Sequence, residues 1–303
     1  LLAAKNPDEA YIIISQAPAW KFLENSRINE GLIKARLRNI CGMPVVEGAD
    51  RIMDWINKES NEFSPLLGNN LADLEVKSLS VENTSVPQNP FELKWDEAKN
   101  IGLEINDRAD FWLGYYKEPR LIYTAPAFRM GPWKASNRRT VHIAIDVFAD
   151  EGTELFAPLE GEVFTAEYRD GPLDYGGVII LKHSTPHKDE FFTLYGHLDP
   201  IFLNNLKAGD KIEKGQRFCQ LGDPNVNGGW APHVHFQLAL TIDGMESDWP
   251  GVADPDDLNF WSSICPNPAS LLNLEESDCL YEPSNKKEVL NDRLNHFGTN
   301  LSV

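Results

Sequence analysis

Two histidines stand two residues apart in the sequence PHVHF, at His233 and His235. An apolar run, QLAL, continues the segment, which is therefore expected to be a β-strand. Residues i and i+2 of a strand point to the same face, which places these two side chains about 6–7 Å apart at Cα. That spacing suits one metal ligand beside one group that accepts or donates protons.

More residues of the same chemical kind lie upstream: His142 and Asp146 in VHIAIDV, and His197 in YGHL. A hydrolytic zinc site usually has three His or carboxylate ligands, an open position for water and a nearby acid/base group. Together with the pair in PHVHF, these residues predict such a site. A regular strand would separate the Cα atoms of His142 and Asp146 by about 13 Å. We therefore expect a bend or bulge near His142.

The segment from Thr140 to Leu240 must position these residues. Short alternating runs are separated there by Gly, Asp and Pro turns, a texture typical of an antiparallel all-β domain. The runs that predict strands are VHIAIDV, GEVFTAEY, GVIILKH, FFTLYGHL, RFCQLG and HVHFQLAL.

The flanking regions have a different texture. Helical periodicity predicts helices at about 28–40 and 48–58. Residues 64–95 are typical of a connector, with short strands around 74–81, and residues 96–135 are aromatic-rich. We interpret those aromatics as core or interdomain packing rather than a ligand groove. Residues 245–265 are expected to be an acidic loop and 267–274 a closing helix.

Composition excludes several partners. The 303 residues include 46 Asp and Glu against 28 Lys and Arg, a net charge of −18. Such acidity disfavours nucleic acid and anionic membrane surfaces as partners. No apolar run approaches the ~20 residues of a membrane span. The four cysteines form no CxxC pair, which predicts reduced, mostly buried thiols and a cytoplasmic setting, with a Cys265–Cys279 disulfide as the alternative.

The stretch 140–275 resembles the lysostaphin-type zinc metallopeptidases, which cleave peptide cross-links of peptidoglycan. HIAID matches the family's His-x-x-x-Asp pair, and YGHL, the hairpin KAGDKIEKGQ and PHVHFQL follow in family order. EGTELFAPLEGEV also carries the family's pattern, at Gly152, Thr153, Ala157, Pro158 and Gly161. Val234 and Gln237 stand where the family usually has Leu and Glu.

The resemblance implies a role for each residue of the predicted site. His142, Asp146 and His235 would hold Zn²⁺, while His197 and His233 would act on the water and the oxyanion. Which of these two histidines is the base stays open. The implied fold is mainly β: a two-layer antiparallel β peptidase domain of the duplicated hybrid motif type, with a small α-helical N-terminal segment.

Other features of the resemblance concern the surroundings of the site. The zinc would lie in a groove between loops, one of them 222–232, where Trp230 is placed to form a wall. The other three histidines, His183, His187 and His296, match nothing essential and are expected at the surface. The hairpin KAGDKIEKGQ is also similar to part of a biotinyl or lipoyl carrier domain, but that interpretation leaves the metal motifs unexplained.

The two ends carry a second resemblance. Residues 1–62 are similar to the closing helical part of an aminoglycoside-phosphotransferase-like kinase, and the tail is similar to the lead-in to a class III aminotransferase. The expected division is therefore a helical segment at 1–62, a connector at 63–99, the metallopeptidase domain at 100–275 and a polar tail or linker at 276–303. The chain would then be the middle of a larger, bacterial, multidomain protein.

Three functions fit the sequence. The first is a zinc metalloendopeptidase that hydrolyses peptide bonds of the peptidoglycan type, with a peptide or small amide as substrate. A small-molecule amidase in a multidomain protein of amine metabolism is the second, and the suspected fusion favours it in the cytoplasm. A wall hydrolase would instead be secreted or periplasmic. The third is a non-catalytic binding module that keeps the fold, which would be expected to have lost ligands.

Overall fold

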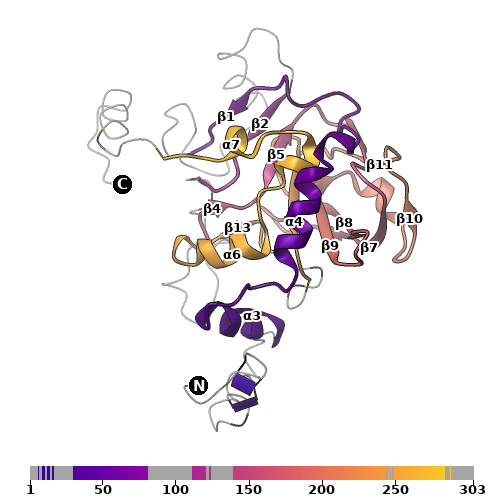
Figure 1. Cartoon of the computed structure of the whole chain (residues 1–303). Coiled ribbons are helices and arrows are strands. Elements are labelled where there is room, and N and C mark those ends of the chain that lie inside the picture. Colours follow the sequence, from indigo (N-terminus) through magenta and orange to yellow (C-terminus); the bar gives the residue numbers. More distant parts are fainter. Residues whose placement is uncertain are drawn as a thin grey trace.

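The computed structural model describes residues 30–80, 111–120, 139–242 and 249–283, with short pieces at 6, 9–10, 12–13, 16, 123, 245, 247 and 287. Strands predominate in these ranges and pair mostly antiparallel (Figure 1). The predicted mainly β, antiparallel fold is therefore confirmed. No helix in the described ranges is long and apolar enough to cross a membrane.

The main sheet has eight strands in the order β1-β2-β5-β12-β9-β8-β7-β10. Every neighbouring pair is antiparallel except β1 with β2. The central strands are buried on both faces, which explains why β8 contains a continuous apolar run, VIIL at 178–181. The strands are β1 (Val76–Lys77), β2 (Trp112–Gly114), β5 (Ile145–Phe148), β7 (Gly161–Arg169), β8 (Gly176–Ser184), β9 (Glu190–Leu198), β10 (Lys211–Ile212) and β12 (His233–Ala239).

Two smaller sheets accompany the main one. The first pairs β6 (Glu154–Phe156) with β11 (Arg217–Gln220), and it packs on the main sheet where the rings of Tyr195 and Phe218 lie 4.9 Å apart. The second has the order β13-β4-β3, with β3 (Glu118–Pro119), β4 (Val141–His142) and β13 (Val252–Ala253). The second of these small sheets carries His142 of the predicted site, at the end of β4.

The expected strand VHIAIDV is broken in two. β4 ends at His142, β5 begins at Ile145, and the two pieces pair in different sheets. The predicted bend near His142 is thus confirmed. Because the chain turns between the two pieces, His142 and Asp146 approach far more closely than a regular strand would allow.

Helices α3 (Glu30–Ile40) and α4 (Ala49–Lys58) lie where the periodicity predicts them. Ile52 and Ile56 of α4 are buried in the same core as the sheet, and the ring of Trp55 lies 5.9 Å from that of Phe191 on β9. Figure 1 shows α4 lying beside the strands and α3 further toward the N-terminus. The β domain therefore buries the apolar face of α4.

The stretch 245–265 is not simply a loop, contrary to the prediction. Its described part contains β13, the short helix η5 (Pro255–Asp257) and helix α6 (Leu258–Ile264). Three of the acidic residues that suggested a loop, Asp254, Asp256 and Asp257, stand at the start of these helices, where negative charge is favourable. Phe260 and Ile264, four residues apart, are the buried positions of α6.

The expected closing helix at 267–274 is a short 3₁₀ turn, η6 (Ala269–Leu272). After it, α7 (Glu276–Cys279) returns to the domain, and the Tyr116 backbone N–H donates to the Cys279 carbonyl over 2.8 Å. In the described ranges the other 3₁₀ helices are η1 (Ser60–Glu62) and η4 (Pro200–Asn205). The first residues of the expected polar tail are thus packed against the aromatic-rich segment.

Segments outside the predicted catalytic range contribute to the same structure. The Ser64 N–H donates to the Pro158 carbonyl and the Phe156 N–H to the Leu66 carbonyl, each over 2.8 Å. The division of the chain into domains stays a prediction, but the described part of the expected connector is joined to the β domain by hydrogen bonds.

The aromatics and cysteines follow the sequence interpretation where they are described. Trp112 and Tyr116 are buried, so these two are core residues, whereas Trp95 and Trp133 lie outside the described residues. All four cysteines are free thiols, and three of them, Cys219, Cys265 and Cys279, are buried.

Candidate metal centre

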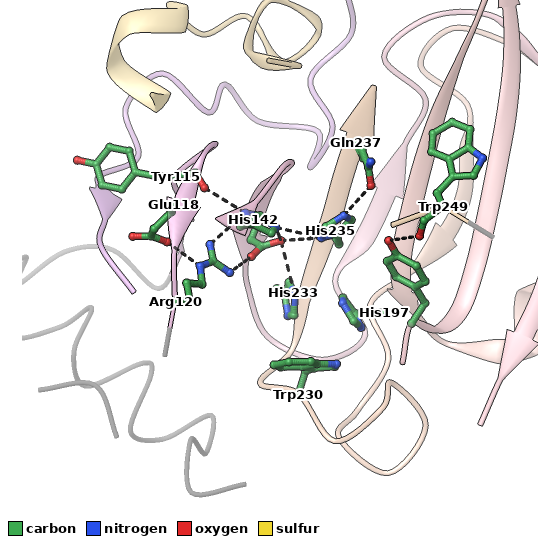
Figure 2. Close-up of polar contacts among 12 residues, drawn as sticks. Tyr115, Glu118, Arg120, His142, His197, Trp230, His233, His235, Gln237 and Trp249 are labelled. Atoms are coloured by element: carbon green, nitrogen blue, oxygen red, sulfur yellow. Dashed lines mark hydrogen bonds and ion pairs between the residues drawn. The ribbon is translucent and has the colours of Figure 1, made fainter. Parts of the chain in front are cut away.

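Strands β4, β5 and β12 bring three predicted ligands together. His235 is paired directly opposite Asp146 across β12 and β5. His142 Nε2 lies 3.1 Å from both Asp146 Oδ1 and His235 Nδ1, and His235 Nδ1 lies 3.3 Å from Asp146 Oδ1. All three side chains are buried, and Figure 2 shows the two histidines converging on this point.

Neighbouring groups fix the tautomers of the two histidines. His142 Nδ1 lies 3.1 Å from the Tyr115 carbonyl, which can only accept, and 3.3 Å from Arg120 Nη2, which can only donate. The shorter contact assigns the Nδ1 proton to the bond with the Tyr115 carbonyl. Gln237 donates its amide N–H to the Pro250 carbonyl, so its Oε1 accepts from His235 Nε2–H over 3.0 Å. His142 Nε2 and His235 Nδ1 are therefore left with lone pairs.

Asp146 Oδ1, His142 Nε2 and His235 Nδ1 are therefore three acceptor atoms that face one another, and no proton lies between them to form a hydrogen bond. Asp146 Oδ1 is buried and has no hydrogen-bond partner, although such an atom is costly to leave unsatisfied. Ligand atoms at Zn²⁺ bond lengths in a tetrahedral shell lie about 3.3 Å apart. The observed 3.1–3.3 Å separations match those edges. The residues thus fit a tetrahedral cation with two nitrogens and one carboxylate oxygen.

His197 reaches the site because of a bulge in β9. Gly196 is paired with His235, so in a regular strand His197 would face the opposite side. Instead, β9 has one extra residue relative to β8 between Tyr195 and Leu198, and His197 has a φ of 66°. A bulge re-aims the side chain it carries. The ring of His197 therefore lies 4.3 Å from that of His233.

Both predicted acid/base histidines also have fixed tautomers. His197 Nδ1–H donates to the Asn227 carbonyl over 2.9 Å, and His233 Nδ1–H donates to the Ala231 carbonyl over 2.6 Å. Each Nε2 consequently has a free lone pair. His233 Nε2 lies 3.7 Å from Asp146 Oδ1, so its lone pair faces the ligand cluster.

The electrostatics match a metal site at neutral pH. Burial lowers the pKa of His142 to about 4 and also lowers the pKa of His197 and of His233. Burial acts to raise the pKa of Asp146, but the Arg120 guanidinium, which donates to Oδ2, helps to hold it well below its usual range. His142, His197 and His233 are therefore neutral and Asp146 is ionised, and neutral imidazole and ionised carboxylate are the forms that bind a metal.

Arg120 is a site residue that the sequence did not predict. Its Nη1 donates to Asp146 Oδ2 over 2.6 Å, and its Nε donates to Glu118 Oε2 over 2.6 Å. Glu118 also accepts from Ser78 Oγ and the Leu79 N–H, and all three charged side chains are buried (Figure 2). With one oxygen of Asp146 held by Arg120, the other is presented to the ligand cluster. No motif of the sequence marked Arg120.

Asn227 is a second residue that the sequence missed. Its side-chain amide donates to the Gly222 and Trp230 carbonyls, and its Oδ1 accepts from the Gly229 and Trp230 N–H groups. These bonds hold the loop 222–232 in its conformation. The backbone carbonyl of Asn227 in the same loop accepts the hydrogen bond from His197 Nδ1–H. Trp230 stands 5.8 Å from the His197 ring, as expected for a wall of the site (Figure 2).

The remaining histidines differ from one another. His183 is buried, so its predicted place at the surface is wrong. Its Nδ1–H donates to the Glu160 carbonyl over 2.7 Å, and its Nε2 lies 2.8 Å from Thr193 Oγ1. His187 is exposed as predicted, and His296 lies outside the described residues.

Comparisons with known proteins agree with this geometry. The sequence model of Peptidase family M23 matches residues 140–248. An uncharacterized metalloprotease of Haemophilus influenzae is 30% identical over 99 residues, which are 33% of this chain and 18% of that protein. The chain thus spans less than a fifth of the length of that curated relative.

Several solved structures align at low similarity. The catalytic domain of the antimicrobial peptidase lysostaphin from Staphylococcus simulans is 23% identical, with 49% of this chain and 92% of that chain covered and a TM-score of 0.30. A zinc-containing peptidase from Vibrio cholerae is 23% identical, with 38% and 31% covered and a TM-score of 0.28. Scores of this size add no weight to the family match.

Residues 140–248 are a domain of Peptidase family M23, and for this stretch the resemblance to lysostaphin-type enzymes is confirmed. The matched range contains the five predicted site residues. The likeness of the two ends to a kinase and an aminotransferase stays a prediction.

Proposed function

We propose that this protein is a zinc-dependent hydrolase of peptide or amide bonds. The observation that carries the proposal is the convergence of three buried lone pairs, from His142, Asp146 and His235, at tetrahedral separations beside two further histidines. A site of this kind has a use only when a cation is present.

The residues of the chain have distinct tasks in such a reaction. When bound, Zn²⁺ supplies Lewis acidity, which polarises a carbonyl and makes water a nucleophile near neutral pH. The Nε2 lone pairs of His197 and His233 face the site, so either can accept the proton of the attacking water. A histidine protonated in this way can then donate to the departing nitrogen and stabilise the oxyanion.

His233 is placed better than His197 to be the base. Its Nε2 lies 3.7 Å from Asp146 Oδ1, within the ligand cluster, and its ring stacks on Phe148 at 4.7 Å, which fixes its orientation. The second histidine would then stabilise the oxyanion from the side of the Trp230 loop. This assignment of roles is part of the proposal.

The intact set of polar residues argues against a non-catalytic module. A binding surface needs neither a buried, metal-ready carboxylate nor two histidines with fixed tautomers. For the natural substrate, the family resemblance favours peptide cross-links of peptidoglycan, and a small amide is the alternative. The cytoplasm remains our proposed compartment, and a wall substrate would require export.

Activity profiling tests this function. The purified protein is incubated with peptidoglycan fragments, synthetic peptides and small amides, with and without Zn²⁺ and with a neutral chelator. Zinc-dependent release of new amino groups from one class would identify the scissile bond. If the folded, zinc-loaded protein hydrolysed none of these substrates, that result would contradict the proposal.

A further inference from the structure

Gln237 lies directly behind the predicted metal ligand His235. The two residues are two apart on β12, so their side chains share one face of the strand. His235 Nε2–H, on the nitrogen that does not face the ligand cluster, donates to Gln237 Oε1 over 3.0 Å (Figure 2). Because Gln237 is fully buried, its amide has to be matched by partners in the interior.

The surroundings of Gln237 select an amide rather than a carboxylate. Its Nε2 donates to the Pro250 carbonyl over 3.1 Å. A backbone carbonyl can only accept, so the atom that faces it has to carry a hydrogen. Burial raises the pKa of the Cys265 thiol to about 12, and a hydrogen bond with the Gln237 side chain acts against that rise. A carboxylate ion at this position would have no hydrogen to offer to the Pro250 carbonyl.

The Pro250 carbonyl is itself held in place by the ligand segment. The Ile143 N–H, in the bend between β4 and β5, donates to the Gly251 carbonyl over 3.1 Å. A Cβ at Gly251 would come within 2.9 Å of His235 Cε1 and 3.1 Å of its Nε2. The lack of a side chain at Gly251 therefore lets this turn lie against the His235 ring, with the Pro250 carbonyl beside Gln237.

Gln237 is also one of the positions at which this sequence departs from the pattern usual for lysostaphin-type enzymes, which have Glu there. The oxygen that accepts from a metal-binding histidine fixes the orientation of its ring and strengthens it as a ligand. An amide oxygen does so without adding a negative charge to the site. The hydrogen bond to Pro250 gives a physical reason why the neutral residue stands in this chain.

We propose that Gln237 is a positioning residue of the metal site, which acts through His235. Its amide oxygen holds the ring with Nδ1 toward the ligand cluster, and its amide hydrogen, required by the Pro250 carbonyl, makes a neutral residue necessary at this position. This inference rests on the zinc site of the proposed function, since it names a further residue on which the zinc affinity of that site depends.

Two substitutions separate the acceptor of Gln237 from its donor. Gln237→Met removes both at similar volume, whereas Gln237→Glu keeps the acceptor and removes the donor. Zinc affinity of the full chain is measured at pH 8 by competition with a chromophoric chelator. Gln237→Met should lower it about 10-fold, and Gln237→Glu should retain at least the wild-type affinity, because His235 Nε2–H keeps its acceptor. The matched control is Gln220→Met, which removes a part-buried amide that donates to Asp199 and should leave the affinity unchanged.

The stability of the metal-free protein tests the requirement for an amide. At pH 8 a carboxylate at this position either faces the Pro250 carbonyl as an anion or takes up a proton, and each of these costs free energy. The urea midpoint of metal-free Gln237→Glu should therefore lie about 0.5–1 M below that of the metal-free wild type. Circular dichroism verifies that each variant is folded before zinc is added.

The outcomes separate this inference from the proposed function. Equal zinc affinities of Gln237→Met and the wild type would overturn the positioning role. An equal loss in Gln237→Met and Gln237→Glu would also overturn it, since the bond to Pro250 rather than the bond to His235 would then explain the effect. An unchanged urea midpoint in Gln237→Glu would overturn the requirement for an amide. These results would leave the proposed hydrolysis standing, whereas a folded wild-type protein that binds no zinc would contradict both.

Discussion

His183 and the site histidines share a buried environment but differ in what their ring nitrogens meet. Burial lowers the pKa of His183 to about 4, as it does for His142. Both nitrogens of His183 have partners, the Glu160 carbonyl and the Thr193 hydroxyl. In contrast, each site histidine has one nitrogen fixed by an oxygen acceptor and one lone pair left over. A leftover lone pair, rather than burial or a lowered pKa, is therefore what marks a functional histidine here.

The largest expected effect concerns the two histidines that are not ligands. His197→Ala and His233→Ala should each lower kcat by roughly 10²–10⁴-fold, because proton transfer is lost. Zinc content should stay near that of the wild type. The matched control is His183→Gln, which should retain both zinc and turnover. Zinc loss in His233→Ala equal to that in His235→Ala would mean that the assignment of ligands is wrong.

A smaller effect is expected from the buried pair behind Asp146. The double variant Arg120→Met with Glu118→Gln removes two opposite charges together, so the net charge is unchanged. Asp146 Oδ2 then loses its 2.6 Å donor, and the carboxylate is no longer held toward the cluster. Zinc affinity, measured by competition with a chromophoric chelator, should fall about 10- to 100-fold. An unchanged affinity in a folded variant would contradict this positioning role.

The smallest effect concerns stability at His183. Since its pKa is about 4 in the folded state and near 6.5 when unfolded, the unfolded state binds the proton more readily. The contribution of neutral, buried His183 to stability is therefore fully present above pH 6.5. As the pH falls toward 4, the free energy of unfolding decreases by about 3 kcal/mol at most. Urea unfolding at several pH values should show a shallower pH dependence for His183→Gln. Identical slopes for the two proteins would refute this assignment.

Much of the site could be predicted because its signals are local. The i, i+2 histidines of PHVHF lie on one strand, and the pattern HIAID identifies a second strand that must bend. The same locality explains why α4 was found by its apolar period. Short apolar runs bounded by turn residues also located the main strands, since β8, β9 and β12 are buried at almost every residue.

What could not be predicted depends on partners that are distant in sequence. The bulge that turns His197 toward the site follows from the pairing of β9 with β8. The burial of His183 depends on Thr193 and Glu160 in neighbouring segments, and the role of Arg120 requires a contact with Asp146 across 26 positions. In 245–265 the acidic residues suggested a loop, whereas the structure shows that Asp254, Asp256 and Asp257 begin short helices.

The most direct test of the account is the zinc content of the protein purified without added metal. Elemental analysis of the wild type should give close to one Zn per chain, and so should His183→Gln. Asp146→Ala should lose most of it, because this change removes both a ligand and the charge that offsets the cation. A folded wild-type protein without zinc that also fails to bind added Zn²⁺ would contradict the claim that the three converging lone pairs form a metal site.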